Sequence, residues 1–223
     1  MPGDTGRSYG AHEIELGHKA ANTQTLQHIG KSFLDYTGAG LLIIALFPVF
    51  LIVGALVALE GGLPIVYKRH VMGSNGEFDA FKFRSMKKSA DAILTADPIM
   101  QAEFEQNYKL KNDPRLTRVG SFLRRTSLDE LPQLFNVLRG EMSLVGPRMK
   151  TPAEVEKYGC YKKSLLAVKP GITGYWQVNG RQTVDYDERI RMDMHYIENW
   201  NLAMDLRILL KTPLKVLKKE GAY

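Results

Sequence analysis

An uncharged apolar run from Leu41 to Leu59, LLIIALFPVFLIVGALVAL, constrains the fold of this 223-residue chain more than any other feature. As a straight helix it would measure roughly 28 Å, at about 1.5 Å per residue, which is close to the thickness of a hydrocarbon core. Pro48 stands near its middle and removes a backbone donor, so we expect the helix to kink or break there. A spanning helix, a helix that enters and leaves by one membrane face, and a buried core helix are all compatible with these facts.

The charges around the apolar run predict its orientation. Upstream, Lys19 and Lys31 are balanced by Glu13 and Glu15. The downstream basic residues are Lys68, Arg69, Lys82, Arg84, Lys87 and Lys88. Under the positive-inside rule, this downstream side should face the cytoplasm.

The part before the apolar run, residues 1–30, has no apolar period. It also lacks a secretory signal, because the apolar run begins too late and no small-residue cleavage pattern closes it. We therefore predict a mobile N-terminal tail over residues 1–30, which can end in a short helix. A membrane segment over residues 31–60 and a cytoplasmic domain over residues 61–223 follow.

The composition restricts the chemistry without deciding it. A formal net charge of +6 favours an anionic partner, which nucleic acid, an anionic membrane or a phosphorylated substrate would all satisfy. The single cysteine, Cys160, excludes an internal disulfide and argues against a cysteine-based zinc site. His70 and His195 lack nearby ligand spacing. The segment 185–187 matches a short metal pattern of glycosyltransferases, but no apolar strand precedes it.

The pattern of the cytoplasmic domain predicts helices around a small β element. Strands are expected over residues 65–67 and 78–83, joined by a turn at residues 73–76. Helices are expected over 90–96, 99–110, 118–125, 132–138, 152–168 and most of 186–219, with a strand or extended loop over 172–178. We therefore predict an α+β fold that is predominantly helical.

The C-terminal segment is amphipathic and basic. Leu206, Leu209, Leu210, Leu214 and Leu217 lie near one helical face, with the lysines mostly elsewhere. Such a helix can lie on an anionic membrane or pack on its own domain, and the pattern does not separate these readings. Pro213 argues against one uninterrupted helix.

Two adjacent carboxylates, Asp129 and Glu130, follow two arginines in the segment RRTSLDELP. One interpretation is a helix start, with Ser127 and Glu130 as a capping box. The other is a reacting centre, because a carboxylate near a helix N-terminus and Arg124 stays ionised and can act as a nucleophile or metal ligand. The segment alone leaves both interpretations open.

Several basic residues are candidates for binding phosphate. Lys82 and Arg84 share one face of the second predicted strand. Arg148 follows a rigid Gly-Pro step and offers a preorganised guanidinium fork. Residues 171–177 and Arg181 form a Gly-rich, aromatic loop that could hold a base or sugar. An ordinary solvated surface is the alternative for each.

In their order, these segments resemble the bacterial sugar transferase family of monotopic phosphoglycosyl transferases. The resemblance rests on Lys31 to Asp35 ahead of the broken apolar helix, then KFRSM, DPRLTRVGSFLRRTSLDELPQLFNVLRGEMSLVGPR, PGITGYWQVNGR and NWNLAMDL. It covers Lys31 to about Thr212. The longer spacer between KFRSM and DPR is similar to the exopolysaccharide hexose-1-phosphate transferases, including the galactose type.

Two departures from the family pattern concern basic residues. This chain has Arg69-His70-Val71 where the family commonly has Gln-x-Arg before Gly73, so the role of that arginine does not transfer. Met149 replaces the second proline of the usual Pro-Arg-Pro, which we expect to loosen Arg148.

The resemblance implies a re-entrant helix broken at Pro48, which would make the chain a monotopic protein of the inner (cytoplasmic) membrane. Its catalytic domain would lie on the cytoplasmic face, with amphipathic helices against membrane phospholipid. The implied reaction transfers a hexose 1-phosphate from a UDP-hexose to undecaprenyl phosphate and releases UMP, as the priming step of exopolysaccharide biosynthesis. Galactose or glucose is the preferred sugar, a homodimer is compatible with the family, and no nucleic-acid partner is expected.

The resemblance also assigns roles to the candidate residues. Asp129 would be the nucleophile that forms a covalent phosphosugar-aspartate intermediate, and Glu130 would bind Mg²⁺. The substrate-binding residues would be Lys82, Arg84, Arg124, Arg148 and Arg181.

Two other functions compete with this reading. A glycosyltransferase that releases UDP has its only local support in residues 185–187. A basic protein that binds nucleic acid or a membrane surface would leave Asp129 and Glu130 with a capping role alone.

Overall fold

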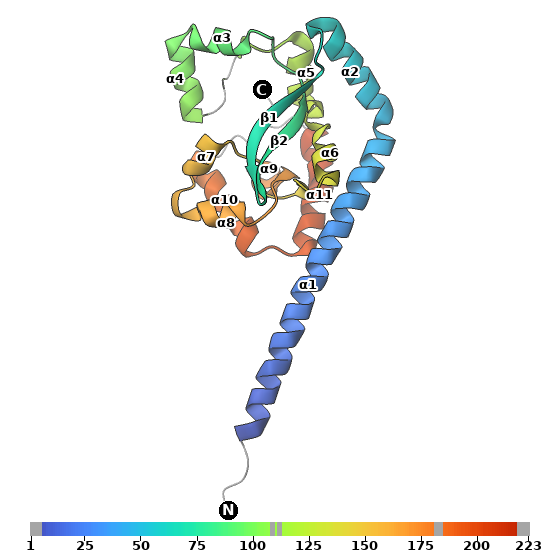
Figure 1. The fold of residues 1–223 in the computed structure, drawn as a ribbon, viewed down its shortest axis with the longest axis vertical. Coiled ribbons are helices and arrows are strands. Elements are labelled where there is room, and N and C mark those ends of the chain that lie inside the picture. The colour runs from blue at the N-terminus through green and yellow to red at the C-terminus, as the bar shows by residue number, and fades with distance from the viewer. Residues whose placement is uncertain (1–5, 108–109, 111–112, 181–184, 218–223) are drawn as a thin grey trace, which may run out of the picture.

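A computed structural model describes residues 6–107, 110, 113–180 and 185–217 of the chain. Helices dominate it, and two small two-stranded sheets supply the β element (Figure 1). The predicted α+β class with a helical majority is confirmed.

The apolar run is divided between two helices, α1 (Gly6–Ala45) and α2 (Phe47–Gly61). Pro48 lies in the first turn of α2, where its missing N–H leaves no helical hydrogen bond unmade. No single helix among the described residues is long and apolar enough to cross a membrane. The pair formed by Thr25–Ala45 and Phe47–Gly61, bent by 65°, meets that test together by length and composition.

The exposure of the bent pair shows that it is not an ordinary core element. Large apolar side chains face outward on both helices, with Ile44 74% exposed and Leu59 84% exposed. Only one face packs inward, where Val53 and Val57 join a cluster with Leu123. A contiguous apolar surface of this kind favours contact with something other than water. The interpretation of this segment as a wholly buried core helix is therefore wrong.

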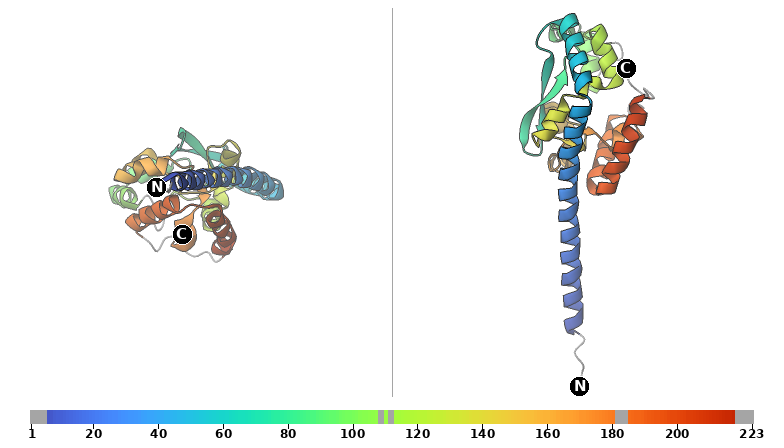
Figure 2. Two further views of the ribbon diagram at one scale, coloured as in Figure 1. Left: turned by 90° about the horizontal axis from the view of Figure 1, so that it is seen from below. Right: turned by 90° about the vertical axis from the view of Figure 1, so that its right-hand side faces the viewer.

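The first helix extends much further toward the N-terminus than its sequence suggests. It begins at Gly6, so residues 6–30 are helical throughout, where we expected at most a short helix at the end of the tail. Extending an existing helix costs less than nucleating one, and the apolar segment supplies the nucleus. This N-terminal part of α1 projects away from the globular part (Figures 1 and 2). The mobility of residues 1–30 stays a prediction.

The larger sheet is a hairpin of β1 (Val66–Gly73) and β2 (Gly76–Phe83), in which Gly73 pairs with Gly76. The predicted turn is confirmed, and the positive φ of 104° at Gly76 explains the glycine there. The smaller sheet pairs β3 (Ser143–Val145) in parallel with β4 (Gly171–Thr173). The expected strand over 172–178 is right only at its start, because α9 (Tyr175–Asn179) follows.

The remaining helices mostly follow the predicted spans. They are α3 (Ala90–Thr95), α4 (Pro98–Asn107), α5 (Arg118–Thr126), α6 (Gln133–Leu138), α7 (Pro152–Glu156), α8 (Lys162–Leu166), α10 (Tyr186–Glu198) and α11 (Leu202–Leu217). The single helix expected over 152–168 is divided at Gly159, which has a positive φ of 52°. Pro213 lies inside α11, so the predicted interruption of this helix is wrong. The proline lacks one backbone N–H, and the helix continues past it to Leu217.

The main core lies where the bent pair α1–α2, the hairpin and the C-terminal helix meet. Ala39 of α1, Val71 and Ala80 of the hairpin, Val137 of α6 and Ile208 of α11 are all buried in it. The hairpin and α11 lie on opposite sides of α1 (Figure 2). Both the carboxylate segment and the Gly-Pro-Arg segment are therefore attached to a core that α1 helps to build.

The outward face of α11 is apolar. Leu206, Leu210 and Leu214 are exposed, whereas Ile208 is buried. Packing on the domain thus uses another face of the helix and leaves these leucines available for a membrane surface.

Candidate active site

Asp129 and Glu130 lie in a short 3-10 turn, Leu128–Glu130, between α5 and α6. The turn is set by Ser127, which ends α5 in the left-handed region with φ 57°. Within the described part of the chain, the Ser127 side chain makes no capping hydrogen bond. The predicted capping box is therefore wrong, because the reversed backbone directs the Glu130 carboxylate to other partners.

Glu130 receives two cationic side chains from different elements. Its Oε1 lies 2.7 Å from Nζ of Lys82, which comes from β2, and 2.7 Å from Nη2 of Arg148, which follows β3. The Glu130 and Lys82 side chains are each only 13% exposed, so water screens the pair little. Burial alone would raise the pKa of Glu130, but the charges of Arg148 and Lys82 outweigh it and hold that pKa well below its usual range. These charges therefore favour the ionised form of Glu130.

Asp129 is the more deeply buried carboxylate, with 6% of its surface exposed. Within the described residues, no hydrogen bond or ion pair reaches its side chain. Burial raises the pKa of Asp129, the charge of Lys82 opposes this rise, and the neighbouring charge of Glu130 adds to it. The pair is thus asymmetric: Glu130 contacts both cations, and Asp129 has no hydrogen-bonded partner among the residues that the structure describes. Burial works against the expected ionisation of Asp129, although the nearby cations favour it.

Arg124 approaches the pair from α5. Its Nε donates to Ser85 Oγ at 3.0 Å, and its charge opposes the rise in the pKa of Asp129. Gly120 allows α5 to lie this close, because a Cβ there would come within 1.9 Å of the Ser85 carbonyl oxygen. Lys82, Arg124 and Arg148 are therefore brought together around the two carboxylates.

Sequence reasoning gave no role to Asp113, which supports Arg124 from behind. Its carboxylate receives Nε and Nη2 of Arg115, both at 2.8 Å, and lies 3.9 Å from Nη1 of Arg124. Its carboxylate is almost fully buried. The signal that could have found it was the segment that begins DPR, in which an aspartate and an arginine lie two positions apart.

Two further arginines were predicted to bind substrate, and the structure places only one of them, Arg84, which is not part of this cluster. Arg84 lies just beyond β2, and its Nη2 donates to the carbonyl oxygen of Gly62 at the end of α2. A guanidinium satisfies the exposed carbonyls of a helix C-terminus well, which explains this placement. Arg181 lies outside the described residues. A substrate role for either arginine stays a prediction.

The two departures from the family pattern have structural counterparts. Arg69 pairs with Glu154 at 2.9 Å, and Glu154 also completes a capping box with Thr151 at the start of α7. Met149 is buried in the main core, and the residues on both sides of it form β-bridges to other segments. The backbone around Arg148 is therefore held on both sides, and the expected loosening by Met149 is not observed.

Comparison with known proteins bears on this arrangement directly. The model of the family described as bacterial sugar transferase matches residues 26–219. The chain belongs to this family. The match spans every element that contributes a residue to the cluster around Asp129 and Glu130.

Three curated relatives of this bacterial sugar transferase carry functional names. The chain is 47% identical over 197 residues to the UDP-galactose-lipid carrier transferase of Erwinia amylovora, and the match covers 86% of the chain and 41% of that protein. It is 46% identical over 198 residues to the undecaprenyl-phosphate galactose phosphotransferase of Salmonella typhimurium, and the match covers 86% of this chain and 41% of that protein. It is 44% identical over 200 residues to the exopolysaccharide production protein ExoY of Sinorhizobium fredii, and the match covers 87% of this chain and 88% of that protein. The chain thus spans less than half the length of the first two.

This sugar transferase also has a second buried polar cluster, which the sequence did not reveal. Asp193 of α10 is fully buried and accepts a hydrogen bond from the Tyr158 hydroxyl at 2.7 Å. Lys150 lies over the rings of Tyr158 and Tyr186, at 5.4 and 5.5 Å from their centroids. Burial raises the pKa of Asp193 to about 6, although the charge of Lys150 opposes the rise.

The sequence patterns that we had discounted have ordinary structural roles in this sugar transferase. Asp185 caps α10 by accepting a hydrogen bond from the Glu188 amide at 2.7 Å, so the short metal pattern is a helix start. His70 is exposed and pairs with Glu77 at 2.8 Å. Across the described ranges, no group of three or more His, Cys, Asp or Glu side chains is arranged to hold a metal.

Proposed function

We propose that this sugar transferase moves a hexose 1-phosphate from a UDP-hexose to undecaprenyl phosphate and releases UMP, as the priming step of exopolysaccharide biosynthesis. The names of the relatives support the donor, the lipid acceptor and the process. Galactose is the first sugar to test, because two of those names contain it. The observation that carries the proposal is the buried Asp129, which has no hydrogen-bonded partner in the described part of the chain, beside a Glu130 that contacts two cations.

In the first half-reaction, a carboxylate oxygen of Asp129 attacks the phosphorus that carries the sugar. The bond from this phosphorus to the bridging oxygen breaks, and UMP leaves with the electron pair. The hexose phosphate is then linked to Asp129 as an acyl phosphate. In the second half-reaction, a phosphate oxygen of undecaprenyl phosphate attacks the same phosphorus, and the Asp129 carboxylate leaves unchanged.

The cations around the pair match the charge that this reaction must handle. Phosphoryl transfer depends mainly on positioning and on neutralising the oxygens of the transferred group. Lys82, Arg124 and Arg148 come from three separate elements and converge on the carboxylates. We infer that they hold the diphosphate of the donor across Asp129.

We also propose that Glu130 helps to bind Mg²⁺ together with the phosphates of the substrate. Mg²⁺ sites of this kind use one or two carboxylates, several waters and substrate oxygens, so a larger acidic cluster is unnecessary. Both cationic contacts of Glu130 use Oε1, and Oε2 takes part in neither. The residues therefore fit an open, substrate-bridged site. When bound, the ion would neutralise charge on the transferring phosphate.

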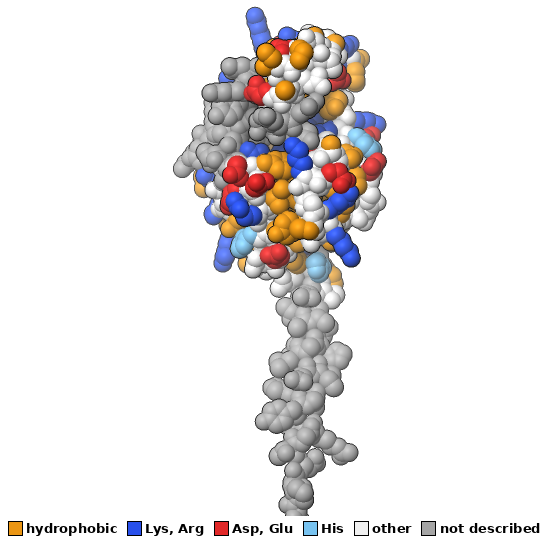
Figure 3. Space-filling model, turned by 90° about the vertical axis from the view of Figure 1, so that its left-hand side faces the viewer, with side chains coloured by type: hydrophobic (Ala, Val, Ile, Leu, Met, Phe, Trp, Pro, Cys, Tyr) orange, Lys and Arg blue, Asp and Glu red, His pale blue; other side chains and the backbone are white. Residues whose placement is uncertain are grey.

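For the bent pair α1–α2, we propose a re-entrant, monotopic placement in the inner membrane. The 65° bend, the position of Pro48 and the apolar exposure of both helices support it. The face in Figure 3 mixes acidic, basic and apolar side chains instead of presenting one basic patch. The exposed leucines of α11 would rest on phospholipid, and the basic residues after α2 favour a cytoplasmic position for the catalytic domain.

Product analysis tests this function. The full chain in lipid nanodiscs is incubated with undecaprenyl phosphate and UDP-galactose, UDP-glucose or UDP-N-acetylglucosamine, with and without Mg²⁺. We expect Mg²⁺-dependent release of UMP from a UDP-hexose. Release of UDP instead would show attack at the sugar carbon and would overturn the proposal.

A further inference from the structure

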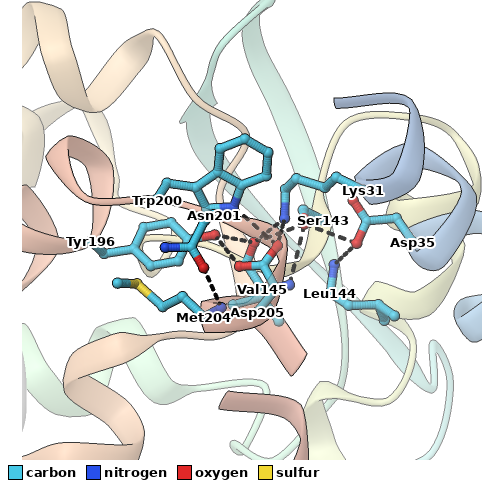
Figure 4. Close-up of polar contacts among 10 residues, drawn as sticks. All are labelled: Lys31, Asp35, Ser143, Leu144, Val145, Tyr196, Trp200, Asn201, Met204 and Asp205. Carbon is cyan, nitrogen blue, oxygen red and sulfur yellow. Dashed lines mark hydrogen bonds and ion pairs between the residues drawn. The ribbon is translucent and has the colours of Figure 1, made fainter. Parts of the chain in front are cut away.

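A buried ion pair joins the membrane pair to the strand that leads to Arg148. Lys31 Nζ, from α1, lies 2.6 Å from Asp205 Oδ2 and donates to the Val145 carbonyl at 3.0 Å (Figure 4). Asp205 is fully buried on α11 and also accepts hydrogen bonds from the Tyr196 hydroxyl at 2.8 Å and Trp200 Nε1 at 3.1 Å. Lys31 thus bridges α11 and the end of β3.

The next turn of α1 holds the start of the same strand. Asp35 Oδ1 accepts hydrogen bonds from Ser143 Oγ at 3.0 Å and from the Leu144 amide at 2.9 Å (Figure 4). Lys31 and Asp35 are four residues apart, so they share one face of α1. Each residue of β3 is therefore hydrogen-bonded to a side chain of α1.

The connection between β3 and Arg148 is short and closely packed. Arg148 follows Val145 by three residues, and the two residues between them are closely fitted. A Cβ at Gly146 would come within 2.6 Å of the Lys169 carbonyl oxygen, and the Pro147 carbonyl accepts the Gly171 amide at 2.8 Å. A displacement of β3 must therefore move Arg148.

The second membrane helix makes the corresponding connection to the other side of the site. Glu60, near the end of α2, accepts the backbone amides of Arg118 and Val119 at 2.7 and 2.8 Å. These are the first residues of α5, where a carboxylate also stabilises the helix dipole. Arg124 lies on the same helix, which ends immediately before the turn that carries Asp129.

We propose that α1 and α2 position the active site. Helix α1 holds the segment that carries Arg148, and α2 holds the helix that carries Arg124. Lys31, Asp35 and Asp205 position Arg148 through β3, and Glu60 positions Arg124 through α5. The angle between α1 and α2 then sets the spacing of the two arginines. The inference rests on the proposed function, since that spacing matters only if both arginines hold the substrate's phosphates.

The alternative is that these contacts only stabilise the fold. The two cases differ in a double-mutant cycle, because positioning couples a residue to one particular arginine, whereas general stabilisation does not. The cycle pairs Lys31→Met with Arg148→Ala, and Glu60→Gln with Arg124→Ala. The crossed pairs, Lys31→Met with Arg124→Ala and Glu60→Gln with Arg148→Ala, are the matched controls.

Turnover is measured as UMP release by the full chain in nanodiscs. We expect Lys31→Met to lower it on the order of 10-fold alone but less than about twofold further when Arg148 is already alanine, a coupling within the range for contacting networks. Crossed pairs should lose the product of the two single effects. Lys31→Arg keeps the charge and should retain most of the turnover, which guards against loss of folding as the explanation. Multiplicative losses in the matched pairs would overturn the proposal.

Amide hydrogen exchange gives a second readout that needs no activity. Lys31→Met should speed exchange over residues 143–148 and leave 118–121 unchanged, and Glu60→Gln should do the reverse. Unchanged exchange at 143–148 in Lys31→Met would overturn the positioning role. If the wild type released no UMP from any UDP-sugar, the proposed function would fail. The exchange pattern would still decide whether α1 holds residues 143–148 and α2 holds residues 118–121.

Discussion

Lys82 Nζ lies 2.7 Å from Oε1 of Glu130, although 48 positions separate the two residues in the chain. Arg148 reaches the same oxygen from a third segment. Two cations on one carboxylate oxygen in a poorly solvated site make that oxygen the electrostatic centre of the cluster. Asp129, next to it, receives neither contact and is therefore available for chemistry.

Replacing Lys82 should weaken catalysis and ease metal binding at the same time. Lys82→Gln removes a charge that neutralises phosphate, so we expect turnover to fall by roughly 10²-fold. It also removes a positive charge that lies 2.7 Å from the Glu130 carboxylate and repels a second cation, so less Mg²⁺ should be needed for half-maximal UMP release. Lys68→Gln is the control, because Lys68 is exposed on β1 and its contact with Asp79 is long, at 3.8 Å. An increased Mg²⁺ requirement in Lys82→Gln would contradict this repulsion.

Much of the fold was predictable because local rules govern it. Residue types with strong conformational preferences explain the hairpin turn, the span of α5 and the end of α6. Gly140, for example, follows α6 and has a positive φ of 76°, which glycine adopts readily. The length of α1 and the division of 152–168 were not predictable, because they depend on a neighbouring helix and on one glycine adopting a positive φ.

The residues that cluster around Asp129 and Glu130 were predictable, but their arrangement was not. Asp129, Glu130, Lys82, Arg124 and Arg148 were all named from the sequence. The strand pattern could not show that Arg84 turns to the end of α2, because alternation no longer applies beyond Phe83. The capping-box pattern failed at Ser127 because a left-handed residue reverses the chain there.

Replacing the Asp129 carboxylate should abolish turnover without harming the fold. An amide is not a competent nucleophile, so Asp129→Asn should lower UMP release by at least about 10³-fold. Because burial already disfavours the charged form of Asp129, we expect the melting temperature in detergent to stay unchanged or to rise. Full activity in this variant would exclude the covalent aspartate. A sharply lower melting temperature would contradict the view that this carboxyl group does not contribute to stability.

Ser127 offers a test of the turn itself. At φ 57° a glycine is unstrained, so Ser127→Gly should raise the free energy of unfolding by up to about 1 kcal/mol. If Ser127 instead capped a helix, the same change would cost a few tenths of a kcal/mol and Ser127→Ala about 1 kcal/mol. Denaturant unfolding of both variants separates the two interpretations. A less stable Ser127→Gly would restore the capping interpretation.

The buried Asp193 should make stability depend on pH between about 4 and 6. Its folded pKa of about 6 lies above the ordinary value, so the folded state binds more protons in this range. Its contribution is therefore fully present below about pH 4 and is lost as the pH rises through about 6. Asp193→Asn removes this loss, so its stability relative to the wild type should improve by roughly 1 kcal/mol from pH 5 to pH 7.5. Asp187→Asn, exposed on the same helix, should show no such change. A constant difference between Asp193→Asn and the wild type across this range would mean that Asp193 does not change its protonation state there, which would contradict a folded pKa of about 6.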